Sequence, residues 1–173
     1  MAVCTFFLSL LLLLFTGCST KKAAPHEQSV KNEQTSKKIS KISYKPKSNN
    51  WITVALYEEY KKWYKTPYKY GGLTPDGVDC SSLVQQIYED AFGIHIPRTT
   101  KYQVRKGHKV SKESARAGDL VFFKIGYNKR HAGIIIERGK FIHTSQKHGV
   151  SVSQLSNPYW KNNYWQSRRI LPE

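Results

Sequence analysis

The sequence contains few cysteines, and this scarcity leaves no disulfide for the part of the chain that can fold. Of three cysteines in 173 residues, Cys4 and Cys18 flank an apolar run at the N-terminus. Only Cys80 lies in the region whose composition supports a core, and it has no cysteine partner there. A lone cysteine is most often a small buried hydrophobic residue. Its neighbours must therefore decide whether Cys80 has a chemical role.

Zinc-binding spacings are also absent, since the sequence has no CxxC, HxxxH or HExxH pattern. Cys80, His131 and His143 could supply three zinc ligands, but nothing in their spacing supports that alternative. We expect neither a metal nor a cofactor.

Acidic residues are scarce: 12 Asp and Glu stand against 28 Lys and Arg, which gives a formal net charge of +16. Such an excess favours an anionic partner, whether nucleic acid, an anionic membrane surface or an acidic polymer. A nucleic-acid binder is disfavoured because interleaved aromatic motifs are missing. An export signal at the N-terminus also disagrees with that function.

No apolar run is long enough to span a bilayer, which needs about 20 residues. The run "FFLSLLLLLF" at 6–15 fits the apolar region of a secretory signal. The following "FTGC" resembles a bacterial lipobox, although Phe15 stands where leucine is usual and no Lys or Arg precedes the run. We expect residues 1–17 to be a lipoprotein signal peptide and Cys18 to be lipidated. An ordinary signal peptide is the alternative.

Residues 18–50 are expected to be a flexible basic tether after the lipidated cysteine. Residues 19–50 hold eight lysines, two glutamates and little apolar surface, a composition that cannot order itself. As a coil, the tether would reach roughly 30 Å. Ser19 follows the cysteine where an aspartate often retains lipoproteins in the inner membrane. The outer membrane is therefore favoured over the inner one, with the protein facing the periplasm.

Residues 51–173 are expected to fold as a single domain of the α+β class, with helices first and an antiparallel sheet after them. Apolar spacing predicts a first helix that starts near Trp51, is capped by Asn49 or Asn50, and stops at Pro67. A second helix is predicted from Cys80, with Asp79 as its N-cap and Gly93 at its end. A short helical stretch at 99–107 follows, and alternation predicts strands at 119–124, 131–137, 140–145 and 149–155.

These elements place Cys80 in the first turn of a helix, where the helix N-terminus can lower a thiol pKa and favour the nucleophilic thiolate. A cysteine nucleophile also needs a general base. His131 opens one apolar strand, His143 interrupts a neighbouring one, and these two are the candidates. A single histidine in such a place is usually a core residue, but two of them with a cysteine at a helix start favour catalysis.

Five separated segments resemble the NlpC/P60 family, above all its small lipoprotein members. They are "YKYGGLTPDGVDCSSLVQQIYEDAFGIHIPRTT", "ARAGDLVFFK", "RHAGIII", "FIHTSQKHGV" and "NPYWKNNYWQSRRI". The resemblance covers nearly all of residues 51–173 in the expected order. It implies a papain-like fold with the nucleophile at a helix N-terminus. It also implies a cell-wall cysteine endopeptidase that hydrolyses amide bonds in peptidoglycan stem peptides.

The same resemblance implies roles for individual residues. Cys80 in "DCS" matches the nucleophile, His131 in "HAG" matches the proton acceptor, and His143 in "FIH" matches the orienting residue. Tyr68 matches a tyrosine that lines the site. Tyr68, Asp79 and Ser81 are taken as candidates for contact with substrate or with the oxyanion.

The chain departs from the family where "DCSGF" is usual and "DCSSL" is found. Ser82 replaces a glycine and Leu83 an aromatic residue, so Ser82 is expected either to narrow access to the site or to alter helix packing. Two other functions stay open. One is an amidase or acyltransferase that uses the same residues on another amide, and the other is a catalytically silent envelope-binding lipoprotein. A monomer is expected.

The spacing of the two histidines predicts an irregular hairpin. Side chains alternate faces along a strand. A two-residue turn at Arg138-Gly139 in a regular ladder would put the histidines on opposite faces. We therefore predict either a three-residue connection that pairs Glu137 with Phe141, or a single bulge. Either would bring both imidazoles to one face, on the side of Cys80.

Overall fold

The computed structural model describes residues 51–172, which form helices followed by an antiparallel sheet. The predicted signal peptide, Cys18, the tether and the caps at Asn49 or Asn50 lie outside these residues. The helices are α2 (Trp51–Trp63), α3 (Cys80–Phe92), α4 (Thr100–Gln103) and α5 (Pro158–Asn163). The strands are β1 (Leu73–Thr74), β2 (Gly77–Val78), β3 (His108–Val110), β4 (Leu120–Gly126), β5 (Lys129–Glu137), β6 (Lys140–Ser145), β7 (Gly149–Gln154) and β8 (Tyr164–Arg169).

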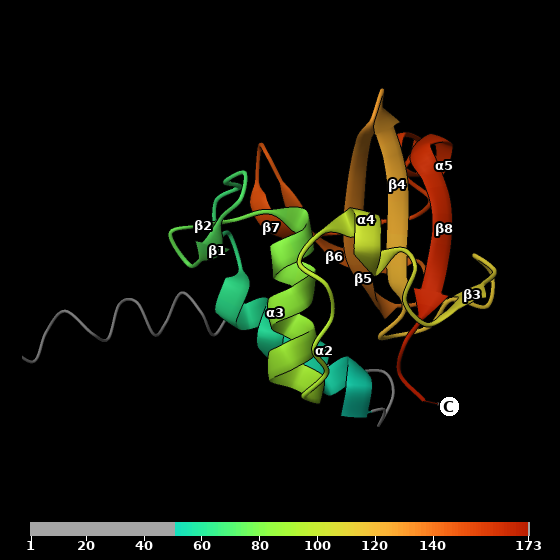
Figure 1. Ribbon diagram of the computed structural model, residues 1–173, viewed down its shortest axis with the longest axis horizontal. Helices are drawn as coiled ribbons and strands as arrows, with labels where there is room; N and C mark the ends of the chain where they lie inside the picture. Colours follow the sequence, from blue (N-terminus) through green and yellow to red (C-terminus); the bar gives the residue numbers. More distant parts are fainter. Residues whose placement is uncertain (1–50, 173) are drawn as a thin grey trace, which may run out of the picture. The chain divides into compact units, whose positions relative to one another are not determined.

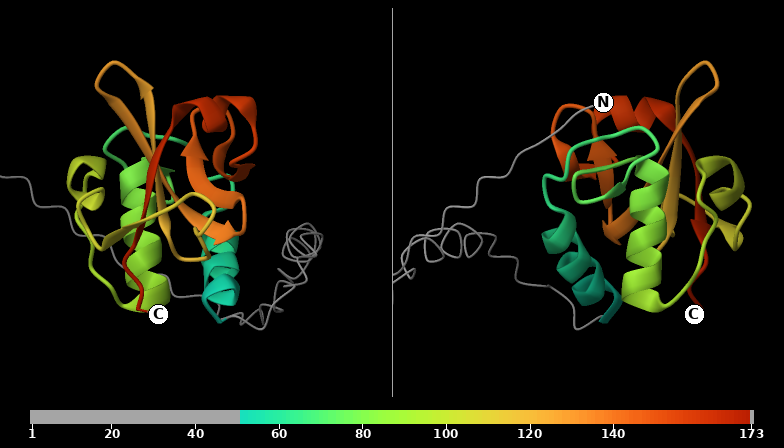
Figure 2. Two further views of the ribbon diagram at one scale, coloured as in Figure 1. Left: turned by 90° about the vertical axis from the view of Figure 1, so that its right-hand side faces the viewer. Right: turned by 60° about the vertical axis from the view of Figure 1, so that its left-hand side comes forward.

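The main sheet has six strands in the order β3-β8-β4-β5-β6-β7, and every neighbouring pair is antiparallel. Helices α2 and α3 lie side by side and pack against its central strands (Figures 1 and 2). The predicted α+β class is confirmed. Strands β1 and β2 form a separate two-stranded sheet in the loop before α3.

Both long helices begin and end for local reasons. The stripe predicted on α2 is present, with Leu56 and Trp63 buried. This helix ends at Trp63, before the predicted stop at Pro67, and Lys65 adopts a left-handed φ of 63° just beyond it. Helix α3 matches its prediction at both ends: Asp79 is the N-cap, and Gly93 closes the helix at a φ of 64°, where glycine is unstrained.

The far edge of the sheet was not predicted. The helical stretch expected at 99–107 is limited to α4, and the residues after it, His108–Val110, pair with β8. Strand β8 lacks clean alternation and buries Arg169, whose guanidinium Nε lies 2.9 Å from Oδ1 of the buried Asp119. An ion pair between a strand and a distant loop leaves no periodic signal in the sequence.

The hairpin between β5 and β6 contains a single bulge, as one of the two predicted arrangements required. Its turn is Arg138-Gly139, so Glu137 pairs with Lys140, and the predicted pairing of Glu137 with Phe141 is wrong. Beyond the turn, Ile135 pairs with Phe141, which leaves one extra residue on β5. Gly139 takes a φ of 79°, which makes the short turn possible.

Strands β5 and β6 separate beyond their last pair, Ile134 with Ile142. Past that point β5 continues with β4 alone, and β6 with β7 alone. The two hairpins then diverge on either side of the N-terminal end of α3 (Figure 1). Gly133 permits the close approach just before the separation, because a Cβ atom there would lie 2.6 Å from the carbonyl oxygen of Ile142. This divergence provides the space for the site described below.

Candidate active site

Helix α3 begins at Cys80 because a reciprocal capping arrangement fixes its first turn. The Asp79 carboxylate Oδ1 accepts the backbone N–H of Ser82 at 2.8 Å, and Ser82 Oγ accepts the backbone N–H of Asp79 at 3.1 Å. Cys80 is therefore the first helical residue, and its own N–H has no acceptor within the helix. This is a position from which a backbone N–H can stabilise an anion.

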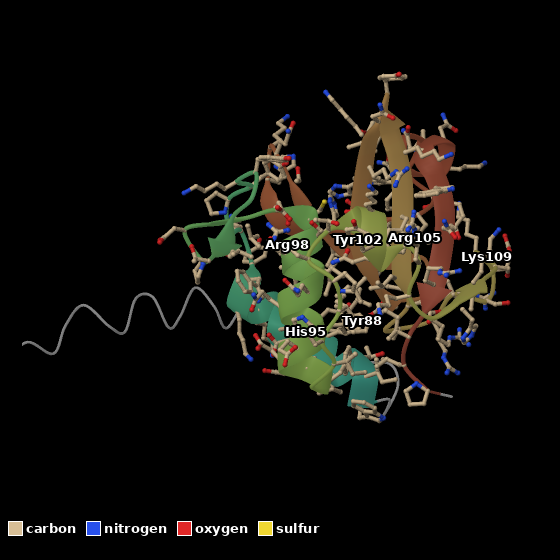
Figure 3. All side chains as sticks on the ribbon, in the orientation of Figure 1. Tyr88, His95, Arg98, Tyr102, Arg105 and Lys109 are labelled. Carbon is tan, nitrogen blue, oxygen red and sulfur yellow. The ribbon has the colours of Figure 1, made fainter. Side chains whose placement is uncertain are left out.

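Arg98 also holds the capping carboxylate. Its guanidinium contacts both oxygens of Asp79, with Nη2 to Oδ2 at 2.6 Å and Nη1 to Oδ1 at 3.0 Å. Figure 3 shows Arg98 beside the N-terminal end of α3. Burial opposes ionisation of Asp79, but hydrogen bonds from Arg98, Ser82 and Ser81 outweigh it and lower the pKa to about 2. Asp79 is consequently an anion at neutral pH, and it fixes the backbone next to Cys80.

His131 and His143 meet on one face of the sheet, as the bulge requires. The Nε2 atom of His131 lies 3.1 Å from the Nδ1 atom of His143, and both rings are buried. The Nε2 atom of His143 lies 2.8 Å from Oγ of Ser153 on β7. Strand β5, strand β6 and strand β7 thus contribute one residue each to a chain of polar contacts.

Aromatic rings enclose the two imidazoles. Trp160 of α5 stacks on His131 with ring centroids 5.3 Å apart, and it meets His143 edge-on at 4.8 Å. Phe123 and Phe141 lie behind these rings within the apolar cluster of the sheet. This packing excludes water from one side of the histidines and fixes their orientation.

A single cleft of about 760 Å³ brings the predicted chemical residues together. Cys80, His131, His143 and Tyr68 all line it, together with Trp160. Cys80 enters from the helix start, the histidines enter from the two diverging strands, and Tyr68 enters from the loop that forms a bridge with Val78. Residues separated by 75 positions in the chain therefore face the same space.

The cleft favours uncharged forms of its reactive groups. Burial raises the pKa of the Cys80 thiol, and the Asp79 carboxylate adds to that effect. Hydrogen bonds at Ala132, Thr100 and Ser81 act in the opposite direction and do not overcome it. The pKa of the Cys80 thiol is therefore raised, whereas the helix N-terminus alone would lower it.

The pKa values of the two imidazoles are lowered, which also favours their uncharged forms. Burial lowers the pKa of His131 to about 3, with a further contribution from its proximity to His143. Burial also lowers the pKa of His143 to about 4. The free protein therefore holds a thiol and two neutral imidazoles at neutral pH.

Other residues predicted to act in the site lie outside the cleft and support the start of α3. Asp79 and Ser81 do not line the cleft; they are buried in the network that fixes the start of α3. Ser82 is fully buried and completes the helix cap, so it acts on helix packing and does not narrow the cleft. Leu83 is likewise fully buried. A contact of Asp79 or Ser81 with substrate stays a prediction.

Three residues of the site were not predicted from the sequence. Ser153 and Trp160 contact the histidines, and Arg98 holds Asp79. The last pair has only a weak signal in the "DCSS" and "IPR" segments, because a carboxylate that becomes buried is usually paired with a cation. Ser153 carries no such signal, because it alternates with apolar residues just as Ser151 does on the same strand.

Between residues 51 and 172, no helix has both the length and the apolar character that a membrane crossing requires. Over the same residues, no three histidine, cysteine or acidic side chains are grouped in a way that could hold a metal ion.

Comparison with known proteins identifies the family. The sequence profile of the NlpC/P60 family matches residues 65–169, which include all of the cleft residues named above. The chain belongs to the NlpC/P60 family. This assignment agrees with the papain-like arrangement of a helix start packed against an antiparallel sheet, and the predicted fold is confirmed.

Several NlpC/P60 proteins are similar over most of this chain. The probable endopeptidase NlpC of Escherichia coli K12 is 41% identical over 160 residues, which cover 91% of this chain and 94% of that protein. The murein DD-endopeptidase and LD-carboxypeptidase MepS of the same strain is 35% identical over 164 residues, covering 92% and 87%. A lipoprotein-like NLP/P60 family protein of Staphylococcus aureus superposes with a TM-score of 0.63 at 32% identity, over 76% of this chain and 45% of that chain.

Proposed function

We propose that the protein is a cysteine peptidase that hydrolyses amide bonds in the stem peptides of peptidoglycan. The observation that carries this proposal is the cleft itself, which is lined by Cys80 at a helix start and by His131, whose ring contacts His143. The similarity to NlpC/P60 proteins named as endopeptidases, one of them acting on murein, supports the choice of substrate.

The contacts of His131 favour one ring nitrogen as the base. Because Nε2 is occupied by His143, Nδ1 is the nitrogen left for the thiol. A neutral imidazole with an unprotonated Nδ1 carries its proton on Nε2 and donates it to Nδ1 of His143. His143 then carries its proton on Nε2 and donates it to Ser153 Oγ. One tautomeric assignment therefore satisfies every contact in the chain.

Acylation begins from the neutral pair. As Sγ of Cys80 forms a bond to the carbonyl carbon of substrate, the thiol proton passes to Nδ1 of His131. The backbone N–H of Cys80 is a candidate donor to the resulting oxyanion, and the Tyr68 hydroxyl is a second one. The C–N bond then breaks, and the imidazolium returns its proton to the leaving amine, which leaves a thioester on Cys80.

Deacylation reverses the roles. Water attacks the thioester carbonyl while His131 accepts one of its protons. The C–S bond then breaks as His131 returns that proton to sulfur, which gives a carboxylic acid and the free thiol. His143 stabilises the transient imidazolium of His131 by holding the Nε2 proton. Asp79, Ser81 and Arg98 support the reaction from outside the cleft by fixing the backbone on either side of Cys80.

Incubation with purified muropeptides, followed by mass analysis of the fragments, tests this function. Hydrolysis adds one water across a stem-peptide amide, and the fragment masses identify the bond. Transfer of the acyl group to an added amine in place of water would indicate an acyltransferase. An intact substrate with retained binding would indicate a silent envelope-binding protein and would refute the peptidase.

We also propose that the enzyme works at the cell envelope as a lipoprotein. Residues 1–17 would be removed, Cys18 would carry the lipid, and residues 18–50 would tether the domain on the periplasmic side of the outer membrane. The lipobox-like "FTGC" and the basic tether support this proposal. Intact-mass analysis of the native protein tests it, since a soluble form that starts elsewhere than Cys18 would refute the anchor.

A further inference from the structure

The walls of the cleft carry positive charge and no negative charge. Lys129, Arg130 and Lys147 line it, whereas none of its lining residues is an aspartate or a glutamate. These three residues are called the cationic rim below. All three are exposed, so their charges face solvent.

The rim comes from both sides of the divergence between the strands. Lys129 and Arg130 belong to the start of β5, next to the β4–β5 turn, and Lys147 belongs to the turn between β6 and β7. Cys80 and the two histidines line the same cleft. A ligand that crosses the reactive groups would therefore meet a cation from each hairpin.

One member of the rim is held in position. The guanidinium of Arg130 lies over the ring of Trp165 at 5.0 Å, and the ammonium of Lys124, its partner across the ladder, lies over the same ring at 4.9 Å. Such cation–π contacts orient an exposed cation without neutralising it. This contact holds the charge of Arg130 at the edge of the cleft that it lines, on the face of β5 opposite to that of His131.

Like charges that converge on one cleft without acidic partners repel one another, and an anionic ligand relieves that repulsion. We propose that the cationic rim binds carboxylate groups of the substrate peptide on both sides of the scissile amide. This proposal rests on the function proposed above and deepens it, because it makes Lys129, Arg130 and Lys147 determinants of specificity for acidic peptides.

Charge neutralisation tests the rim directly. The triple variant Lys129→Gln/Arg130→Gln/Lys147→Gln is compared with wild type on muropeptide dimers released from a purified sacculus by a muramidase. We expect KM to rise roughly two- to fivefold for each charge removed, with kcat nearly unchanged, because rim charges contribute to binding and not to the chemical step. The rise of the wild-type KM between about 0.05 and 0.2 M salt should be much smaller in the variant.

A matched control removes the same number and kind of charges elsewhere. Lys106→Gln/Lys109→Gln/Arg116→Gln neutralises exposed side chains that do not line the cleft. Figure 3 shows Lys109 at the β3 edge of the sheet, away from Arg98 at the start of α3. This control should retain the wild-type KM and its salt dependence. An equal rise of KM in both triple variants would assign the effect to net charge and overturn the rim.

A binding measurement separates the rim from the proposed function. The dissociation constant of the same muropeptides is measured by calorimetry for Cys80→Ser, with and without the rim substitutions. If wild type turns over the muropeptides but the rim substitutions change neither KM nor the dissociation constant, the rim proposal is overturned and the peptidase proposal stands. Rim-dependent binding without any turnover would overturn the peptidase and leave the rim as a ligand site. Rim-dependent binding to phosphatidylglycerol vesicles, with unchanged KM, would assign these cations to a membrane surface and overturn the substrate proposal.

Discussion

The Nε2 atom of His131 lies 3.1 Å from the Nδ1 atom of His143. This contact engages one nitrogen of the proposed base and leaves the other for the thiol of Cys80. It exists because one extra residue in β5 moves the register by one and brings both rings to the same face. A bulge beside the hairpin turn therefore brings the two imidazole rings into contact inside the cleft.

Ser153 is expected to be a positioning residue that acts through His143. Its hydroxyl lies 2.8 Å from Nε2 of His143, so Ser153→Ala removes the group that fixes the ring and its tautomer. We expect kcat to fall about fivefold with little change in KM, which corresponds to the loss of about 1 kcal/mol from one hydrogen bond. Ser153→Thr should restore most of the activity.

Ser151→Ala is the control for Ser153, because Ser151 lies directly opposite His143 in the β6–β7 ladder. It should leave kcat unchanged. Nitrogen-15 NMR of the imidazoles supplies an independent readout, since only Ser153→Ala should populate the second tautomer of His143. Equal effects of the two alanine substitutions on kcat and on the spectra would show that Ser153 has no special role.

The free enzyme is expected to hold Cys80 as a thiol at about pH 7. Burial raises its pKa and lowers that of His131 to about 3, so a proton moves from sulfur to nitrogen only during attack. Thiolate absorbance in the far ultraviolet, measured as a difference against Cys80→Ala, should be absent at neutral pH and appear only at alkaline pH. A thiolate signal at neutral pH would mean that a resting ion pair forms in the cleft.

Acid is expected to destabilise the fold before the carboxylates titrate. The folded-state pKa values of His131 and His143, about 3 and 4, lie below the ordinary value of 6.5, so the unfolded chain binds these protons first. The contribution of the neutral rings is complete above pH 6.5 and is lost as the pH falls below it towards the folded values. At about pH 5 the loss should reach roughly 2 kcal/mol per histidine.

Urea unfolding at about pH 7 and pH 5 measures this loss. His143→Asn should reduce the difference between the two pH values, because one buried imidazole is gone. His108→Asn, at an exposed position on β3, should leave the difference unchanged. A wild-type free energy of unfolding that stays constant over this range would contradict the neutral, buried state of the rings.

Ser82 is expected to matter for stability and not for substrate choice. Its hydroxyl accepts the N–H of Asp79 and donates to the carbonyl of Gly72, and its side chain is fully buried. Ser82→Ala should lower the free energy of unfolding by about 1–3 kcal/mol, because the buried N–H of Asp79 and the partly buried carbonyl of Gly72 each lose a hydrogen bond. Fragment patterns from muropeptides should be unchanged, and a shift in the cleaved bond would place Ser82 in substrate recognition.

Local chemistry in the sequence predicted much of the site. The start of α3 followed from Asp79 before an apolar helical stripe, and the bulge followed from counting the residues between the two histidines. Both predictions rest on short-range rules, which are helix capping and the alternation of side chains along a strand. Counting did not determine the number of residues in the turn. A three-residue loop and a two-residue turn with a bulge both bring the two histidines to the same face of the sheet.

Long-range contacts account for what the sequence could not predict. Strand β8 depends on the pairing of Arg169 with Asp119, 50 positions apart, and Ser153 reaches His143 diagonally and not through its ladder partner. The direction of the thiol pKa was also missed. The helix N-terminus was visible in the sequence, whereas the burial of Cys80 and the nearby Asp79 carboxylate became apparent only in three dimensions.

The most direct test of the central claim is the turnover of muropeptides by Cys80→Ser, measured beside wild type with near-ultraviolet circular dichroism to verify the fold. The substitution exchanges one atom at the start of α3 and leaves the cap of Asp79 and Ser82 in place. We predict an unchanged spectrum and a loss of hydrolysis of at least about 10³-fold, because a serine hydroxyl is a far weaker nucleophile beside the same imidazole. Turnover near the wild-type rate by a folded Cys80→Ser protein would contradict a cysteine nucleophile.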